Sequence, residues 1–216
     1  EDSQFQQWTG VQFPPSPPFV IAHHALFGFF LFAFICLTTG MTEFRVVECT
    51  LHEHGDAILE IFNDAILNST ALFDYEPRTP ENMMAWFEAK SAGNFPVIGL
   101  VNEENILVGF ASMGAFRPFP ANKYTVEHSV YVHKDHRGEG LGRRLLELVI
   151  DAAKQRELHA MIGGITADNI GSIELHKQLG FVHVGTLPEV GFKFGQWQDL
   201  AFYQLTFETP ANPTDG

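Results

Sequence analysis

Residues 136–143 read His-Arg-Gly-Glu-Gly-Leu-Gly-Arg and are the most informative stretch of the sequence. It lies between an apolar, strand-like segment at residues 128–132 and a helix-like segment at residues 141–155. Glycines at alternate positions let the backbone turn tightly and approach a ligand with no Cβ in the way. The free amides of the first helical turn then point at an anion, and the helix dipole adds to the attraction. The stretch therefore predicts a pyrophosphate-binding turn between a strand and a helix.

Two other phosphate-binding turns do not fit this stretch. A Walker loop ends in Gly-Lys-Ser or Gly-Lys-Thr, and no such ending is present. A dinucleotide fingerprint is spaced Gly-x-Gly-x-x-Gly, with an acidic residue about 20 positions further on. The glycines here are spaced differently, at Gly138, Gly140 and Gly142. The pattern that does fit is Arg/Gln-x-x-Gly-x-Gly/Ala, carried by Arg137, Gly140 and Gly142.

That spacing resembles the acetyl-CoA pyrophosphate loop of the GNAT N-acetyltransferase superfamily, which also has a strand before the loop and a helix after it. Residues 169–181, Asn-Ile-Gly-Ser-Ile-Glu-Leu-His-Lys-Gln-Leu-Gly-Phe, are similar to the second signature of that superfamily, which lines the pantetheine arm. The resemblance implies acetyl-CoA as co-substrate, and no residue pattern in the sequence calls for a metal. The side of the site that binds CoA would then contain Arg137, Gly138, Glu139, Gly140, Leu141, Gly142, Arg143 and Asn169.

Further stretches resemble one branch of the superfamily, the phosphinothricin and methionine sulfoximine acetyltransferases. They are residues 63–65, 69–71, 116–119, 125–132 (Thr-Val-Glu-His-Ser-Val-Tyr-Val) and 191–199 (Gly-Phe-Lys-Phe-Gly-Gln-Trp-Gln-Asp). The resemblance extends from Phe44 to about Phe207. It implies direct acetyl transfer to the α-amine of a small amino acid such as phosphinothricin, methionine sulfoximine or methionine sulfone. It also implies a homodimer.

Acetyl transfer to an amine needs a base, because free amines are mostly protonated near pH 7. Glu127 is the candidate, since it lies on the strand that leads to the pyrophosphate turn. Strand alternation puts Glu127, Ser129 and Tyr131 on one side of that strand. The alternative interpretation of Glu127 is an ordinary solvent-facing strand residue.

The resemblance assigns the acetyl group and the pantetheine to Val130, Tyr131 and Val132, through main-chain amides of a strand segment that splays from its neighbour. As side chains, Val130 and Val132 are also ordinary core residues. His176 stands where many members of the superfamily carry a tyrosine acid, and this branch carries histidine there. Its imidazole could protonate the departing thiolate. The alternative is a surface histidine on a helix.

The resemblance also predicts which residues bind the substrate. It places Arg117, Pro118 and Phe119 in the substrate site, together with Glu127, His128 and Ser129. Arg117 is expected to bind the substrate carboxylate in a bidentate manner, and the alternative is a solvated loop arginine. Three aromatic residues, Phe73, Phe119 and Trp197, could form pocket walls, although aromatic residues are more often part of the core.

The composition limits the class of protein. The 216 residues are enough for one domain, and 45% hydrophobic against 18% charged residues are enough for a core. A formal net charge of −13 argues against nucleic acid or an anionic membrane as the main partner. Neither the two cysteines, Cys36 and Cys49, nor the remaining histidines have metal-binding spacing, and the cysteines form no disulfide framework. This cysteine usage fits the cytoplasm.

The composition changes sharply at Met41. Residues 1–40 contain no Lys or Arg, are rich in proline at 13–18, and carry no formal charge at 19–37. Length alone would permit a membrane span there, but basic flanking anchors are missing. We expect residues 1–40 to be a non-native or wrongly assigned extension outside the catalytic domain. The alternatives are a membrane anchor or a packed appendage. The acetyltransferase domain is then 41–209, followed by a tail at 210–216.

The periodicity after Met41 predicts an α+β fold with a mixed central sheet. Strands are expected near 44–48, 97–101, 106–113, 125–132, 160–165, 181–184 and 200–207. Helices are expected at 56–67, 80–92, 141–155 and 169–179, the second capped by Thr79 and closed by Gly93. Two other functions stay open, a GNAT that acetylates a polyamine or a protein N-terminus and a non-catalytic acyl-CoA sensor. Arg117 argues against the first, and the presence of Glu127 and His176 against the second.

Overall fold

The computed structural model of the protein describes residues 43–215, so the expectations for residues 1–40 lie outside the described residues. Every predicted helix and strand is present in the described chain, and the fold class is confirmed as α+β. The strands are β1 (Arg45–Glu48), β2 (Val97–Val101), β3 (Leu107–Ala115), β4 (Thr125–Val132), β5 (Ala160–Thr166), β6 (Val182–Lys193) and β7 (Gln196–Thr206). The helices are α1 (Leu51–Asn68), α2 (Pro80–Ala92), α3 (Leu141–Gln155) and α4 (Ile170–Gln178). Two short 3-10 turns lie at Pro120–Asn122 and Lys134–His136.

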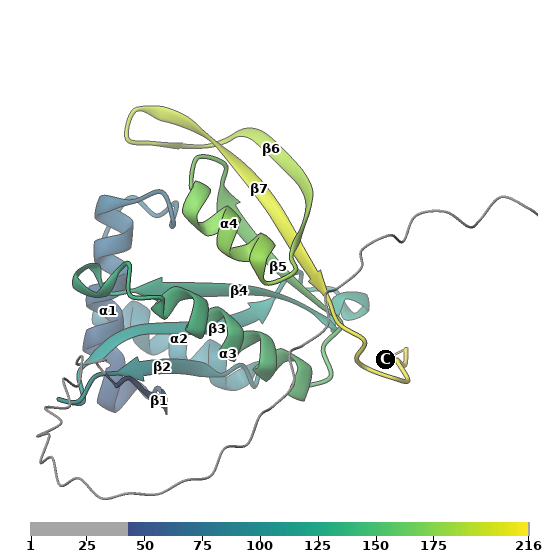
Figure 1. The fold of residues 1–216 in the computed structure, drawn as a ribbon, viewed down its shortest axis with the longest axis horizontal. Coiled ribbons are helices and arrows are strands. Elements are labelled where there is room, and N and C mark those ends of the chain that lie inside the picture. The colour runs from purple at the N-terminus through teal and green to yellow at the C-terminus, as the bar shows by residue number, and fades with distance from the viewer. Residues whose placement is uncertain (1–42, 216) are drawn as a thin grey trace, which may run out of the picture. The chain divides into compact units, whose positions relative to one another are not determined.

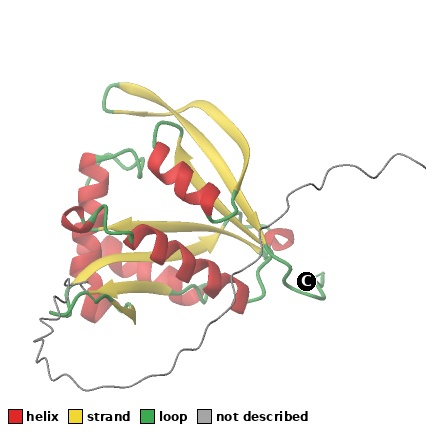
Figure 2. Ribbon diagram, viewed as in Figure 1, coloured by secondary structure: helices red, strands yellow, loops and turns green. Residues whose placement is uncertain are grey.

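The strands form one mixed sheet in the order β1-β2-β3-β4-β5-β7-β6 (Figure 1). Every neighbouring pair is antiparallel except β4 and β5, which run parallel. In Figure 1, α3 and α4 lie in front of the sheet, and α1 and α2 lie behind it. Figure 2 shows the same layers by colour, with red helices on both faces of the yellow sheet. The sheet therefore separates two apolar cores.

Helix α1 begins before its predicted start at Asp56. The Thr50 hydroxyl accepts a hydrogen bond from the Glu53 amide at 3.2 Å, so Thr50 is the N-cap and the helix begins at Leu51. The prediction followed the apolar stripe alone and missed this cap. The start of α2 was predicted correctly. Thr79 and Asn82 form a reciprocal capping box, and Pro80 is the first helical residue.

The last two strands are much longer than predicted. The expected strands at 181–184 and 200–207 are parts of a long hairpin in which β6 ends at Lys193 and β7 begins at Gln196. Its turn is made by Phe194 and Gly195, which have φ values of 53° and 75°. The strand pairing shifts between His183 and Gly185 and again between Leu187 and Gly191. These irregularities break the alternating pattern, so the sequence concealed the length of the strands.

Lys193 holds this hairpin to the end of α1. Its side chain is buried, and its ammonium donates to the carbonyls of Ile66, Ser69 and Leu72 at 2.7, 2.9 and 2.6 Å. The last turn of α1 contains no basic residue of its own. The Lys193 ammonium therefore satisfies carbonyls that the helix end leaves free, at the negative end of the helix dipole. The segment after α1 is thereby held in one place.

Replacing Lys193 should destabilise the domain. A Lys193→Met variant keeps most of the side-chain volume but removes all three donors, so about 3 kcal/mol should be lost from the free energy of unfolding. Urea unfolding measures this loss. Lys154→Met is the control, because it makes the same substitution at an exposed lysine. The Nζ of Lys154 forms only a surface ion pair with Asp151 at 3.8 Å, and such a pair contributes little to stability. Equal unfolding midpoints for the two variants would show that Lys193 does not hold the hairpin.

Candidate functional site

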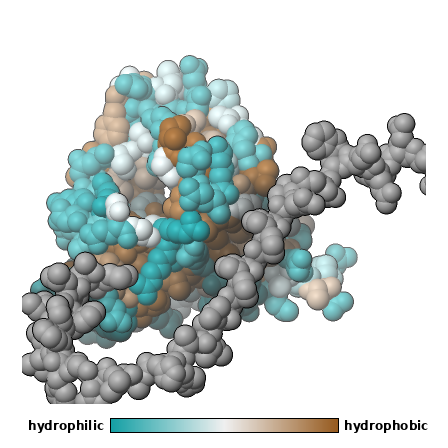
Figure 3. All heavy atoms as spheres, in the orientation of Figure 1, coloured by the Kyte–Doolittle hydropathy of each residue, from teal (hydrophilic) through white to brown (hydrophobic). Residues whose placement is uncertain are grey.

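A cavity of about 620 Å³ opens where β4 and β5 part. Its walls come from β4, the ends of β3 and β5, the first two turns of α3 and α4, the segment after α1, α2 and one residue of β7. The space-filling view shows the molecule hollowed near its middle, with brown, apolar residues in the recess (Figure 3). The volume is in the range of small-molecule sites.

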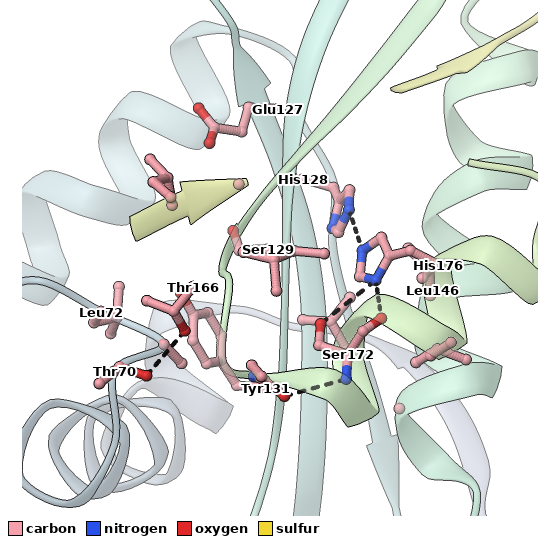
Figure 4. Close-up of a pocket in the computed structure, with 18 of the residues that line it drawn as sticks. Thr70, Leu72, Glu127, His128, Ser129, Tyr131, Leu146, Thr166, Ser172 and His176 are labelled. Carbon is pink, nitrogen blue, oxygen red and sulfur yellow. Dashed lines mark hydrogen bonds between the residues drawn. The ribbon is translucent and has the colours of Figure 1, made fainter. Parts of the chain in front are cut away.

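Half of the predicted site residues line this cavity. They are Glu127, His128, Ser129, Val130, Tyr131, Val132, Gly142, Asn169 and His176. Figure 4 shows several of these side chains around the opening. The rest of the pyrophosphate turn, Arg137 to Leu141 and Arg143, is not part of the cavity wall.

The predicted substrate residues Arg117, Pro118 and Phe119 do not line the cavity; they are exposed in the loop after β3. Of the aromatic residues considered as pocket walls, Phe73 lines the cavity, whereas Trp197 is 61% exposed and does not. Ser172 and Leu175 also line the cavity and belong to the 169–181 signature, and Thr70 belongs to the 69–71 stretch. Sequence analysis did not identify three other lining residues, Leu72, Lys90 and Thr166. They come from separate elements, so no local pattern joins them.

The parting of β4 and β5 leaves one edge of β4 without a partner strand. The pairing runs only from Thr125 to Glu127 on β4, while β5 continues alongside β7 to Thr166. The His133 amide donates to the Val108 carbonyl of β3 at 2.8 Å. Because donors alternate along an antiparallel ladder, the amides of Val130 and Val132 point away from β3, into the gap. These two N–H groups are placed to donate to carbonyl oxygens of an acyl-pantetheine arm.

The Tyr131 side chain packs in the core, whereas Val130 and Val132 contribute main-chain amides to the gap. Its ring packs in the core behind the sheet, 5.1 Å from the Phe62 ring and 5.4 Å from the Phe110 ring between centroids. Burial raises the pKa of Tyr131, so its phenol stays protonated. The ring therefore supports the strand whose backbone faces the gap.

The glycine-rich turn has the backbone that an anion site needs. Gly138 and Gly140 have φ values of 87° and 79°, in the left-handed region that favours glycine. Gly140 is the N-cap of α3, and no side chain caps this helix end. A Cβ built on Gly140 would meet no atom within 4 Å, so there is space in front of the helix end. The uncapped amides of the first turn fit a pyrophosphate.

Two arginines hold the turn in place. Arg137 forms an ion pair with Asp64 of α1, and its Nε donates to the Val132 carbonyl at 3.4 Å. Burial tends to raise the pKa of Asp64, but hydrogen bonds from Asn68 and Arg137 outweigh it and lower that pKa. Arg143 donates to Glu147 at 2.9 Å on its own helix. Its Nη1 also donates to the Gln178 side chain of α4 at 3.1 Å. The two guanidinium groups therefore connect the turn to α1 and α4.

Glu127 points to the opposite side of β4 from His128, as Figure 4 shows. A Cβ built on Gly164 would lie 3.0 Å from Oε1 of Glu127, so a side chain at 164 would push this carboxylate from its position. Partial burial raises the pKa of Glu127, and the nearby charge of Arg117 opposes the rise. A carboxylate with a raised pKa is a stronger base near neutral pH.

His128 and His176 form a stacked pair on the other side of β4. Their Nε2 atoms are 3.0 Å apart, and Nδ1 of His176 lies 2.7 Å from the Ser172 carbonyl. A carbonyl only accepts, so Nδ1 of His176 carries a proton, and Nε2 of His128 donates to Nε2 of His176. Burial, with the charge of His176, lowers the pKa of His128 to about 3. Burial also lowers the pKa of His176, against the Ser172 carbonyl, so both rings are neutral at pH 7.

The pair Gly163-Gly164 makes room on both sides of the sheet at once. A Cβ on Gly163 would lie 2.9 Å from Nε2 of His128 and 3.1 Å from Nε2 of His176. Successive strand residues face opposite sides, so Gly163 admits the histidine pair while Gly164 admits Glu127. Two glycines inside a strand were the sequence signal for this close approach, and the sequence analysis did not use it.

Among residues 43–215, no group of three or more His, Cys, Asp or Glu side chains could hold a metal ion. Within the same range, no helix is both long enough and apolar enough to cross a membrane. Cys49 is buried and free, and burial raises the pKa of its thiol to about 12.

Comparison with known proteins shows what this chain is similar to. The acetyltransferase (GNAT) family profile matches residues 57–181. An L-methionine sulfoximine/L-methionine sulfone acetyltransferase of Salmonella typhimurium is 46% identical over 158 residues, which is 73% of this chain and 91% of the relative. A solved structure from Acinetobacter baylyi, described as an acetyltransferase, is 59% identical with a TM-score of 0.80, covering 81% of this chain and 98% of that one. A phosphinothricin acetyltransferase from Sinorhizobium meliloti, solved with acetyl-CoA, is 30% identical with a TM-score of 0.76, covering 80% and 94%.

A charge at the N-cap of α3 should abolish tight CoA binding. Gly140→Asp places a carboxylate in front of the uncapped amides, so affinity for CoA should fall by about 100-fold, as measured by calorimetric titration. Gly140→Asn adds a side chain of the same shape without the charge, so it should lower the affinity for CoA much less than Gly140→Asp does. Gly195→Asp is the control for backbone strain, because Gly195 has a similar φ of 75° in the hairpin turn. Parent-like affinity in Gly140→Asp would place the pyrophosphate elsewhere.

Proposed function

Because the chain belongs to the acetyltransferase (GNAT) family and is an N-acetyltransferase that uses acetyl-CoA, we propose that it acetylates the α-amine of small amino acids. The proposed substrates are phosphinothricin, methionine sulfoximine and methionine sulfone, which the names of the relatives suggest. One observation carries the proposal. A carboxylate with a raised pKa, Glu127, and the free amide edge of β4 border the same cavity.

The proposed reaction uses residues of this chain at each step. The first-turn amides of α3 bind the pyrophosphate, and the Val130 and Val132 amides orient the pantetheine arm and the thioester carbonyl. Glu127 removes the ammonium proton of the substrate, directly or through a water molecule. The neutral amine then attacks the thioester carbon, so a C–N bond forms and the C–S bond breaks. The attacking nitrogen gives up one further proton as the amide forms, and the leaving thiolate takes up one proton, for which His176 is the proposed donor, so that the products are the N-acetyl amino acid and CoA thiol.

The proposal for His176 becomes more specific with the structure. Its two ring nitrogens face the Ser172 carbonyl and His128, and burial lowers its pKa. A neutral imidazole with both nitrogens occupied is a poor proton donor. The predicted role of His176 as thiolate acid therefore requires that the histidine pair gain a proton during the reaction. The substrate amine loses a proton on the Glu127 side of the gap, which is the side of β4 opposite the histidine pair.

Arg117 keeps its proposed role from a position outside the cavity wall. Its guanidinium is exposed and lies 5.1 Å from the centroid of the Phe116 ring, yet its charge acts on Glu127. The α-carboxylate and the α-amine of an amino acid share one carbon atom. A cation close enough to act on Glu127 therefore suits that carboxylate.

We also propose a homodimer and a cytoplasmic location. The β6–β7 hairpin exposes apolar side chains that a second copy of the chain could cover, namely Val182, Val184, Leu187, Val190, Phe192, Phe194 and Trp197. The cysteine usage is that of a reducing compartment. Sedimentation should show a dimer for the parent and a monomer for Phe194→Asp, with Met84→Asp as the matched exposed control. A monomeric parent would remove the dimer from the proposal.

The role of Glu127 can be tested by kinetics with methionine sulfone and a thiol reagent. The parent enzyme should release CoA thiol, and its kcat/KM should rise with pH as Glu127 loses its proton. Glu127→Gln should lower kcat at pH 7 by about 100-fold, with a smaller loss at high pH, where the free amine is already neutral. Unchanged kcat at pH 7 would remove Glu127 as the base. Turnover with polyamines alone would replace the amino-acid proposal.

A further inference from the structure

Lys90 of α2 is a cation in the cavity that the proposed mechanism does not use. Its Nζ donates to the Met113 carbonyl at 2.7 Å and lies 5.2 Å from the centroid of the Trp86 ring. An ammonium group has three N–H donors, and Met113 is its only hydrogen-bond partner among residues 43–215. No carboxylate in that range forms an ion pair with it. Two donors are therefore left for a ligand.

Gly114 keeps the space between Lys90 and the Glu127 strand open. Gly114 of β3 is directly opposite Glu127 of β4, so both face the same side of the sheet. A Cβ built on Gly114 would lie 3.4 Å from Nζ of Lys90. Directly opposite residues have Cβ atoms about 5 Å apart, so Lys90 and Glu127 border neighbouring parts of one open space. A small molecule in that space meets a cation at one end and a carboxylate at the other.

The surroundings of Lys90 leave its charge poorly solvated. Burial, with the charge of Arg78, lowers the pKa of Lys90 to about 8, so the ammonium is still mostly charged at pH 7. A partly desolvated cation without a counter-ion attracts an oxygen ligand strongly. The charged groups around it are Arg78, before α2, and Glu127 on the facing strand. Arg78 is itself a cation, and the Glu127 carboxylate forms no hydrogen bond or ion pair with Lys90.

We propose that Lys90 binds the oxygen-bearing head of the substrate side chain, such as a phosphinate, sulfone or sulfoximine, and thereby determines which amino acids are acetylated. This inference rests on the proposed function of the site. Arg117 and Lys90 then bind two different groups of the substrate. Arg117 acts on Glu127 and suits the α-carboxylate, which is bonded to the same carbon as the amine. Lys90 then remains for the group at the far end of the side chain.

The test compares two substrates that differ only in the head oxygens, methionine sulfone and methionine. The parent should prefer the sulfone in kcat/KM. Lys90→Met should reduce that preference by about tenfold or more, because it removes a charged donor from the oxygens but leaves methionine unaffected. In Lys90→Met, kcat/KM should fall further for phosphinothricin than for the sulfone, because the head of phosphinothricin is anionic. The KM for acetyl-CoA should not change.

Arg117→Ala is the matched variant within the same site. It should lower kcat/KM for both amino acids by the same factor and leave their ratio unchanged, because both carry the α-carboxylate. A decreased ratio in Arg117→Ala with an unchanged ratio in Lys90→Met would reverse the assignment and overturn the proposal. An equal loss for both substrates in Lys90→Met would also overturn it, since Lys90 would then act on the carboxylate or on the fold alone.

A pH profile keeps the proposal testable if Lys90→Met does not fold. The ionisation of Glu127 affects both substrates and cancels in the ratio of their kcat/KM values. The amines of the two substrates differ in pKa, so each amine is titrated separately and its ionisation is divided out of the ratio. In the parent that ratio should fall above about pH 8, where Lys90 loses its proton. In Lys90→Arg the ratio should stay constant across this range, because arginine keeps its charge. A parent ratio that does not change with pH would contradict the inference.

The two proposals fail in different ways. If the parent releases no thiol with any amino acid, the proposed function is wrong. If the parent acetylates both amino acids but does not prefer the sulfone, only the role of Lys90 is wrong. If Lys90 serves only to bind the Met113 carbonyl, Lys90→Met should lower the melting temperature without changing the substrate ratio.

Discussion

The parting of β4 and β5 is the constraint on which the rest of the structure depends. The two parallel strands pair only as far as Glu127 and Ile162, and β5 then follows β7 away from β4. A strand edge left without a partner normally costs free energy, because its amides lose their hydrogen bonds. Here the edge borders a cavity whose ligand can supply the missing acceptors. The amides of Val130 and Val132, the uncapped first turn of α3 and Glu127 are brought together by this one departure from regular pairing.

The cavity that results must be kept both open and rigid. Gly163 and Gly164 keep it open, since a side chain at 163 would collide with the histidine pair and one at 164 would displace the Glu127 carboxylate. Rigidity comes from contacts between distant parts of the chain. Lys193 fixes the segment after α1 against the hairpin, and the hydroxyls of Thr70 and Thr166 meet at 2.9 Å across the wall (Figure 4). These polar contacts add to the apolar packing of Tyr131 and its neighbours in holding the walls.

Local signals in the sequence predicted the fold class, the helix caps at Thr79 and Gly93, and the turn at residues 137–143, because each depends on neighbouring residues. They also identified the residues of β4 that line the cavity. The sequence did not reveal Lys90 or Lys193, since each acts on backbone carbonyls far away in the chain, and such pairs leave no local pattern. The length of the β6–β7 hairpin was underestimated because its irregular strand pairing interrupts the alternation of apolar and polar residues. For Arg117, resemblance indicated a substrate residue, whereas the structure places it outside the cavity wall.

A crystal structure with CoA and methionine sulfone tests the central claim most directly, since it would show whether the uncovered edge of β4 binds the acyl-pantetheine arm. We expect the pyrophosphate on the first-turn amides of α3 and the pantetheine in the gap between β4 and β5. We also expect the substrate amine within hydrogen-bonding distance of Glu127, directly or through one water molecule. A pantetheine arm bound outside that gap, or an amine remote from Glu127, would contradict it.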